Sequence, residues 1–186
     1  IGSKGDHKIC LIDELDRFID TESGLISGIA RAFRNQYSKL TEIQKTNLIS
    51  RLTCGFTIIG EYNDGAHLIP LPEEEDEPYI EFFGFSKNQG SIPEIESLAG
   101  KPIKDMVEIR NLGFRTVGFQ TYSKEEFDSI PSNIMREGKF AEGYVFYYIN
   151  DSGVVLGIEK YKTSWSLQAK NYLPKHPPQN VPGCLI

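Results

Sequence analysis

Two runs in the C-terminal part of the chain, at residues 141–149 and 154–162, are rich in aromatic and β-branched side chains. Between them lie residues 150–153, with the sequence N-D-S-G, whose residue types favour tight turns. Two such runs joined by a turn predict a β-hairpin. Similar runs at 55–63 and 78–85 predict two further strands.

Apolar residues with helical spacing predict helices in the first half of the chain. Residues 25–33 follow the i, i+3, i+4 pattern of a helix with one buried side. Thr41 and Gln44 match a capping box and predict the start of a second helix, as Ser123 and Glu126 do for a third. The expected buried stripe of the second helix consists of Ile43, Leu48, Ile49 and Leu52.

Shorter patterns fill the remaining chain. Residues 94–98 predict a short helix within a loop rich in glycine and proline, and residues 106–110 and 114–122 predict short strands or strand-like pieces. After the hairpin, Trp165 and Leu167 continue the apolar alternation of a strand.

Several strands with a few helices, no regular β-α alternation and no internal repeat predict an α+β fold of twisted antiparallel sheets with packing helices. A chain of 186 residues can bury one core of useful size. We expect one domain over residues 1–173 and a proline-rich tail or linker over residues 174–186.

Composition narrows the function classes. The net charge of −6 argues against a protein that coats nucleic acid by bulk electrostatics, although it permits a local basic groove. Cys10, Cys54 and Cys184 are widely spaced, which predicts neither a disulfide framework nor a zinc site and fits a reducing compartment. No apolar run has membrane-spanning length and no signal-peptide core is present, so we expect a soluble cytoplasmic chain without a membrane partner.

The predicted hairpin carries a group of side chains that suits a phosphate-bearing ligand. Lys160 and Lys162 are two residues apart and share one face of their strand. Gly143 can relax the pleat so that Glu142 and Val145 approach the same site despite their opposite parity. A carboxylate, an apolar wall and two cations fit a metal-bound nucleotide phosphate. Charges at strand ends are also common as solvated edge residues.

A family resemblance bears on these two interpretations. The sequence E-G-Y-V at residues 142–145, followed by K-Y-K-T-S-W at residues 160–165, resembles motifs IV and V of the covalent nucleotidyltransferases. It is most similar to the phage RNA ligases that repair cut tRNA. The resemblance implies the nucleotidyltransferase, or adenylation, fold, with Lys160 and Lys162 in catalysis and nucleotide binding, Val145 beside the nucleotide, and Glu142 binding or orienting Mg²⁺.

Three weaker matches occur in the family's motif order. The T-x-x-x-E-Y pattern ending at Glu61 and Tyr62 resembles motif III, which implies that Glu61 holds the nucleotide through its ribose. Residues 78–85 lie where motif IIIa supplies an aromatic surface to the base, for which Phe83 or Phe85 could serve. Near the N-terminal end, S-K-G at residues 3–5 resembles a family stretch whose lysine lies close to the bound nucleotide, which implies a catalytic role for Lys4.

The resemblance implies ATP and Mg²⁺ as cofactors and RNA ends, including those of cut tRNA, as partners. In such enzymes a lysine attacks the α-phosphate of ATP to give lysyl-AMP. AMP then moves to an RNA 5′-phosphate, and a 3′-hydroxyl displaces it. Each step adds charge around a phosphorus atom, which nearby cations stabilise.

The family's nucleophile lies in a K-x-D-G motif, which this sequence does not contain. We expect that strand to precede Ile1, so that the chain is an incomplete domain unable to form lysyl-AMP by itself. Three alternatives stay open: another member of the superfamily, such as a DNA ligase or a capping guanylyltransferase; a non-catalytic nucleotide- or RNA-binding module of the same fold; and a β-rich interaction domain with chance matches.

Overall fold

A computed structural model describes residues 12–21, 24–65, 71, 76–87, 102–130 and 142–167. The chain divides into two compact units, one of residues 1–121 and 147–158 and one of residues 122–146 and 159–186. Within the described ranges, no helix combines the length and the apolar character needed to cross a membrane. The predicted helix at 94–98, the tail at 174–186 and Lys4 lie outside the described residues.

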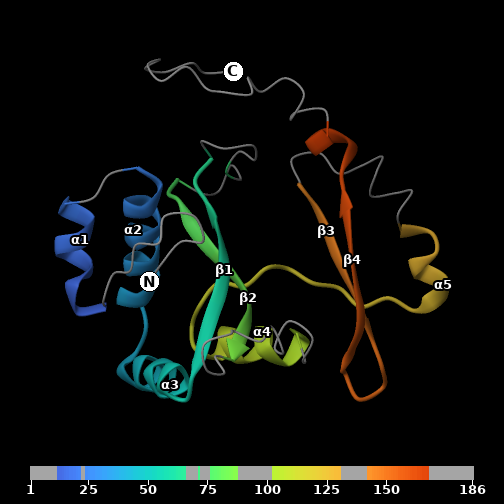
Figure 1. The fold of residues 1–186 in the computed structure, drawn as a ribbon, viewed down its shortest axis with the longest axis horizontal. Helices are drawn as coiled ribbons and strands as arrows, with labels where there is room; N and C mark the ends of the chain where they lie inside the picture. The colour runs from blue at the N-terminus through green and yellow to red at the C-terminus, as the bar shows by residue number, and fades with distance from the viewer. Residues whose placement is uncertain are drawn as a thin grey trace. The chain divides into compact units, whose positions relative to one another are not determined.

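The first unit mixes helices with a two-stranded antiparallel sheet of β1 and β2 (Figure 1). Helices α2 and α4 lie against β2, and α3 lies against β1. The elements of this unit, in chain order, are η1 (Ile12–Glu14), α1 (Leu15–Thr21), α2 (Leu25–Ser38), α3 (Glu42–Thr53), β1 (Phe56–Asn63), β2 (Tyr79–Lys87) and α4 (Pro102–Asn111).

The remaining elements are α5 (Lys124–Phe127) and the hairpin strands β3 (Gly143–Ile149) and β4 (Val155–Lys162), which form a second two-stranded sheet. Mixed helices and small antiparallel sheets confirm the α+β class. The hairpin and the strands predicted at 55–63 and 78–85 are all present, with ends shifted by a residue or two.

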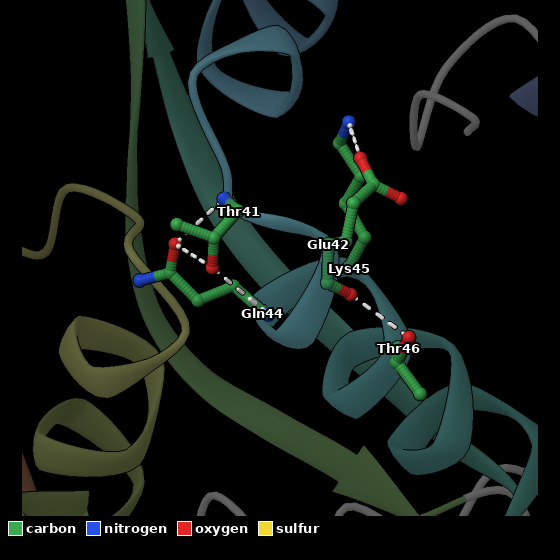
Figure 2. Close-up of polar contacts among 5 residues, drawn as sticks. All are labelled: Thr41, Glu42, Gln44, Lys45 and Thr46. Carbon is green, nitrogen blue, oxygen red and sulfur yellow. Dashed lines mark hydrogen bonds and ion pairs between the residues drawn. The ribbon is translucent and has the colours of Figure 1, made fainter.

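Helix α3 begins at the predicted capping box (Figure 2). The Thr41 N–H donates to Gln44 Oε1 at 2.9 Å, and the Gln44 N–H donates to Thr41 Oγ1 at 3.3 Å. In the same turn the Thr46 hydroxyl donates to the Glu42 carbonyl at 2.8 Å, and Lys45 pairs with Glu42 at 2.7 Å. Orphan N–H groups at the helix start are thereby satisfied, which explains why the helix begins here.

The expected buried stripe of α3 is wrong in most of its members. Leu48 is fully buried, but Ile43 is 74% exposed, and Ile49 and Leu52 are also exposed. At about 100° per residue, Ile43 lies roughly 140° around the helix from Leu48, so the two cannot face one core. Only a narrow side of α3 reaches the core.

A β-bulge shapes the sheet of the first unit. The pairing shifts by one residue between Ile59, which faces Gly84, and Gly60, which faces Phe82. Phe83 is therefore the extra residue on β2. Because a bulge reverses the alternation, Ile80 and Phe82 before it and Phe85 after it are all buried despite their different parity.

The core of the first unit combines these strand residues with one side of each helix. Phe114 lies against both Phe33 of α2 and Phe82 of β2, with ring centroids 6.0 and 5.0 Å away. The buried members are Leu15, Ile19, Ala30, Ala32, Phe33, Leu40, Leu48, Ile80, Phe82, Phe85, Ile109, Leu112 and Phe114.

Polar contacts join the helices to the sheet and to one another. Arg51 of α3 lies over the Phe56 ring at 3.7 Å and pairs with Glu108 of α4 at 3.1 Å. The Phe85 N–H donates to the Asp105 carboxyl group at 3.4 Å. Partial burial at this position raises the pKa of Asp105 above its ordinary value.

Two predicted short strands are corrected. Residues 106–110 belong to α4, whose Met106 and Ile109 are buried one helical turn apart, and Pro102 at its first position is a helix-start signal. The segment at 114–122 makes one parallel bridge, between Thr116 and Phe82, instead of a regular strand. In that bridge the Phe82 N–H donates to the Arg115 carbonyl at 3.0 Å.

The second unit starts with the other predicted capping box. The Ser123 N–H donates to Glu126 Oε2 at 2.7 Å. Hydrogen bonds from the backbone and the side chain of Ser123 lower the pKa of Glu126. The strand expected to continue through Trp165 and Leu167 is wrong, because residues 164–167 form a helical turn. Thr163 starts this turn: its hydroxyl accepts from the Ser166 N–H and its carbonyl accepts from the Leu167 N–H, each at 3.1 Å.

We predict that Gly60→Ala destabilises the first unit. A Cβ at this position would lie 2.8 Å from side-chain carbons of both Ile80 and Phe82 and 2.9 Å from the Glu81 carbonyl. Forced overpacking of this kind costs about 1–3 kcal/mol, measurable by urea unfolding. Gly118→Ala, where a Cβ meets nothing within 4 Å, is the control and should change little.

We also predict unequal effects of two truncations on α3. Leu48→Ala should lower the free energy of unfolding by about 2–5 kcal/mol, because it leaves a cavity at a fully buried position. Ile43→Ala, at a side chain that is 74% exposed, should stay within about 0.5 kcal/mol. Chemical denaturation of both variants measures the difference, and equal losses would contradict the burial described for this helix.

Candidate functional site

The turn that closes the hairpin is built around one side chain. Asn150 Oδ1 accepts from the N–H groups of Ser152 and Val154 at 3.0 and 2.9 Å. Gly153 has φ of 75°, a conformation that glycine adopts without a steric penalty. Local chemistry at residues 150–154 therefore sets which residues of β3 and β4 meet.

At the open end of the hairpin, Glu142 and Lys162 form an ion pair. Lys162 Nζ lies 2.6 Å from Glu142 Oε1, although the two residues are 20 positions apart in sequence. The Lys162 side chain is 33% exposed and that of Glu142 is 31% exposed. The pair is thus partly shielded, yet both charges remain accessible to a ligand from solvent.

Backbone geometry beside this pair brings the two residues together. The Thr163 N–H donates to the Glu142 carbonyl at 3.2 Å. At Gly143 the chains approach so closely that a Cβ would overlap the Tyr161 carbonyl oxygen and lie 3.1 Å from Lys162 Cα. Glycine is the residue that permits such an approach.

Side-chain contacts show which residues share each face of this end of the hairpin. The ring of Phe146 lies edge-on to those of Phe127 and Tyr161, with centroids 5.1 and 5.3 Å away. Phe146 and Tyr161 therefore share the face that packs on α5.

By alternation, Val145, Lys160 and Lys162 lie on the opposite face. Glu142 has the same parity as Phe146 but contacts Lys162, so it reaches the face that carries Val145. Val145 is 47% exposed and Lys160 is also exposed. Alternation and the ion pair thus assign a carboxylate, two cations and an exposed apolar side chain to one face of the hairpin, and all four residues belong to the second unit.

The side chains on the packed face are held by polar contacts as well. Glu159 accepts a hydrogen bond from the Tyr161 hydroxyl, and this contact raises the pKa of Tyr161. The aromatic packing and this hydrogen bond restrict β4 on the side opposite to Lys160 and Lys162.

Glu61 and Phe83, the other residues expected to contact a nucleotide, belong to the first unit. Glu61 is exposed on β1, and its alternation with the inward-facing Ile58 and Tyr62 places it on the side of the strand away from the core. Its partner across the sheet is Glu81. Phe83 at the bulge is only partly buried, whereas Phe85 is fully buried in the core and cannot offer a ring to a ligand without unfolding.

Sequence patterns did not single out Arg115, a cation that pairs with Glu81. Arg115 Nε lies 3.0 Å from Glu81 Oε1, and its guanidinium group lies 3.7 Å from the centre of the Tyr79 ring. No motif marks Arg115. The contact arises because the parallel bridge between Phe82 and Thr116 aligns the segment of Arg115 with β2.

Glu142 is the residue expected to bind Mg²⁺. In the part of the chain that the structure describes, no three His, Cys, Asp or Glu side chains gather into a metal site. Glu142 contributes a carboxylate whose neighbour is an ammonium group. Mg²⁺ commonly binds through one or two carboxylates, water and substrate phosphates, so Glu142 fits an ion held mainly by a nucleotide.

No family model, no curated protein and no solved structure matches this chain.

We predict that Gly143→Ala separates Glu142 from Lys162. The added Cβ would overlap the Tyr161 carbonyl oxygen, so the strand ends must move apart at a cost of about 1–3 kcal/mol. Amide hydrogen exchange should then speed up at Thr163, whose N–H donates to the Glu142 carbonyl. Gly157→Ala is the control in the same hairpin, because its Cβ would meet Tyr148 Cδ2 at an ordinary 3.6 Å.

Proposed function

We propose that this chain is part of an ATP-dependent RNA ligase that joins a 5′-phosphate to a 3′-hydroxyl RNA end through lysyl-AMP and RNA-adenylate intermediates. The observation that supports the proposal is the contact of Glu142 Oε1 with Lys162 Nζ at 2.6 Å, which joins the two segments whose sequences resemble motifs IV and V. Alternation along the strands assigns Lys160 and Val145 to the same face of the hairpin.

The chemistry assigns a role to each of these side chains. When the 3′-hydroxyl oxygen attacks the 5′-phosphorus of adenylylated RNA, a new P–O bond forms and the anhydride bond to AMP breaks. AMP leaves with the electron pair, and the hydroxyl proton passes to solvent. Negative charge grows on the phosphoryl oxygens in this step, and the ammonium groups of Lys160 and Lys162 would stabilise it.

Glu142 would orient a Mg²⁺ ion that the phosphates also bind. A bound Mg²⁺ neutralises phosphate charge and polarises the phosphoryl oxygen. The resemblance also assigns Glu61 and Phe83 of the first unit to the nucleoside, because a carboxylate accepts hydrogen bonds from ribose hydroxyls and an aromatic ring stacks on a base.

The second candidate is a nucleotide- or RNA-binding module without catalysis. It is favoured by the lack of a K-x-D-G motif in the sequence, because lysyl-AMP formation needs a nucleophilic lysine in that context. Both candidates predict ATP binding. They differ in the joining step, which starts from RNA that already carries AMP and therefore needs no nucleophilic lysine.

We predict that the chain joins pre-adenylylated RNA to an RNA with a 3′-hydroxyl in the presence of Mg²⁺. Lys162→Ala and Glu142→Ala should each lower the rate by about 10²–10³, the usual loss when one group that stabilises transition-state charge is removed. Denaturing gels and released AMP measure the reaction. Incubation with ATP and Mg²⁺ followed by intact mass should show no AMP adduct on this chain.

Lys124→Ala and Glu125→Ala, at exposed positions of α5 in the same unit, are matched controls and should join RNA like the wild type. Unfolding curves must show that all four variants remain folded. ATP binding without joining would favour the binding module. If neither ATP binding nor joining is observed, or if the control variants lose as much activity as the site variants, the proposal is wrong.

A further inference from the structure

The ion pair of Glu142 and Lys162 joins two residues that the proposed function assigns to different ligands. Lys162 is assigned to the phosphate chain and Glu142 to the divalent cation, yet their charged atoms lie 2.6 Å apart. While Lys162 donates to a carboxylate, its charge is partly neutralised and one of its donors is occupied. A phosphate group that approaches Lys162 must therefore compete with Glu142.

We propose that Glu142 acts as an internal counter-anion that occupies Lys162 until a divalent cation binds to the carboxylate. The cation then takes Glu142, and the released ammonium group binds the phosphate chain. This inference rests on the proposed function, since it concerns how the same site is loaded. It makes cation binding and phosphate binding cooperative through the protein, in addition to any direct contact between the two ligands.

The local backbone favours such an exchange. The hydrogen bond from Thr163 to the Glu142 carbonyl and the close approach at Gly143 hold the main chains of the two residues, so only side chains need to move. Both side chains are about one-third exposed, which gives cation and phosphate access from solvent. Partial exposure also keeps the ion pair weak enough for a ligand to replace.

The size of the effect follows from this exposure. Ion pairs that are open to solvent contribute little, and their measured contributions correspond to a change of at most about fivefold in an equilibrium constant. The competition should weaken as ionic strength rises, because salt screens charges that are partly exposed.

The test measures binding of inorganic tripolyphosphate to the full chain by calorimetry, with EDTA present and no divalent cation. Tripolyphosphate isolates the phosphate contact from base and ribose, and the absence of metal keeps Glu142 paired with Lys162. Glu142→Gln should bind the probe about two to five times more tightly than the wild type. Lys162→Gln should bind it more weakly, and in a Lys162→Gln background the Glu142→Gln change should bring no gain.

Two further variants separate the ion pair from general electrostatics and from misfolding. Glu159→Gln removes one negative charge from the same hairpin, next to Tyr161 on the opposite face, and should give little gain. Glu142→Asp keeps the charge but shortens the side chain, so it should also raise affinity if contact with Lys162 is what competes. Melting curves accompany each variant.

Failure of the inference can be distinguished from failure of the proposed function. If Lys162→Gln weakens binding but Glu142→Gln leaves affinity unchanged or lowers it, Glu142 does not compete and the inference is overturned alone. Equal gains from Glu142→Gln and Glu159→Gln would overturn it as well, since net charge would then explain both. If Lys162→Gln leaves tripolyphosphate and ATP binding unchanged, the phosphate site itself is wrong and the proposed function fails with it.

Discussion

The fold of the first unit depends on the close approach of β1 and β2 at Gly60. Without a Cβ at this position, the side chains of Ile80 and Phe82 can fill the space over the strand. The bulge at Phe83 then reverses the alternation, so that Phe85 turns to the same core and contacts Phe56 edge-on. Helices pack on that aromatic surface, and this packing stabilises a sheet that has only two strands.

A glycine also permits a close backbone approach in the hairpin, where the result is an ion pair instead of a packed core. Gly143 lets the backbone of β3 approach Tyr161 and Lys162 closely. Glu142 therefore reaches the face of the hairpin opposite to the one that regular alternation predicts for it. An acidic and a basic side chain meet where each is still partly exposed. Partial exposure leaves both charges of this pair accessible to ligands from solvent.

Local signals in the sequence predicted the elements whose causes are local. The capping boxes at Thr41 and Ser123 and the Asn150 turn depend on side chains within a few residues of the backbone groups that they satisfy. The strands around Ile58 and Phe82 were recognisable from their β-branched and aromatic content. The common face of Lys160 and Lys162 is likewise visible in the sequence, because residues two apart share a face in any regular strand.

The sequence alone therefore determined the α+β class, the starts of α3 and α5, the hairpin and the identity of its charged residues. Only the tertiary structure decided that Leu48 is the buried residue of its helix, that Met106 begins no strand, and that the chain turns into a helix after Thr163. It also decided that Glu142 meets Lys162 and that Phe83, not Phe85, keeps part of its ring exposed. The physical reason is the same in each case, because burial and ion pairing depend on which distant segments pack together. The partner of a short apolar run or of a single charged residue cannot be predicted from the local sequence.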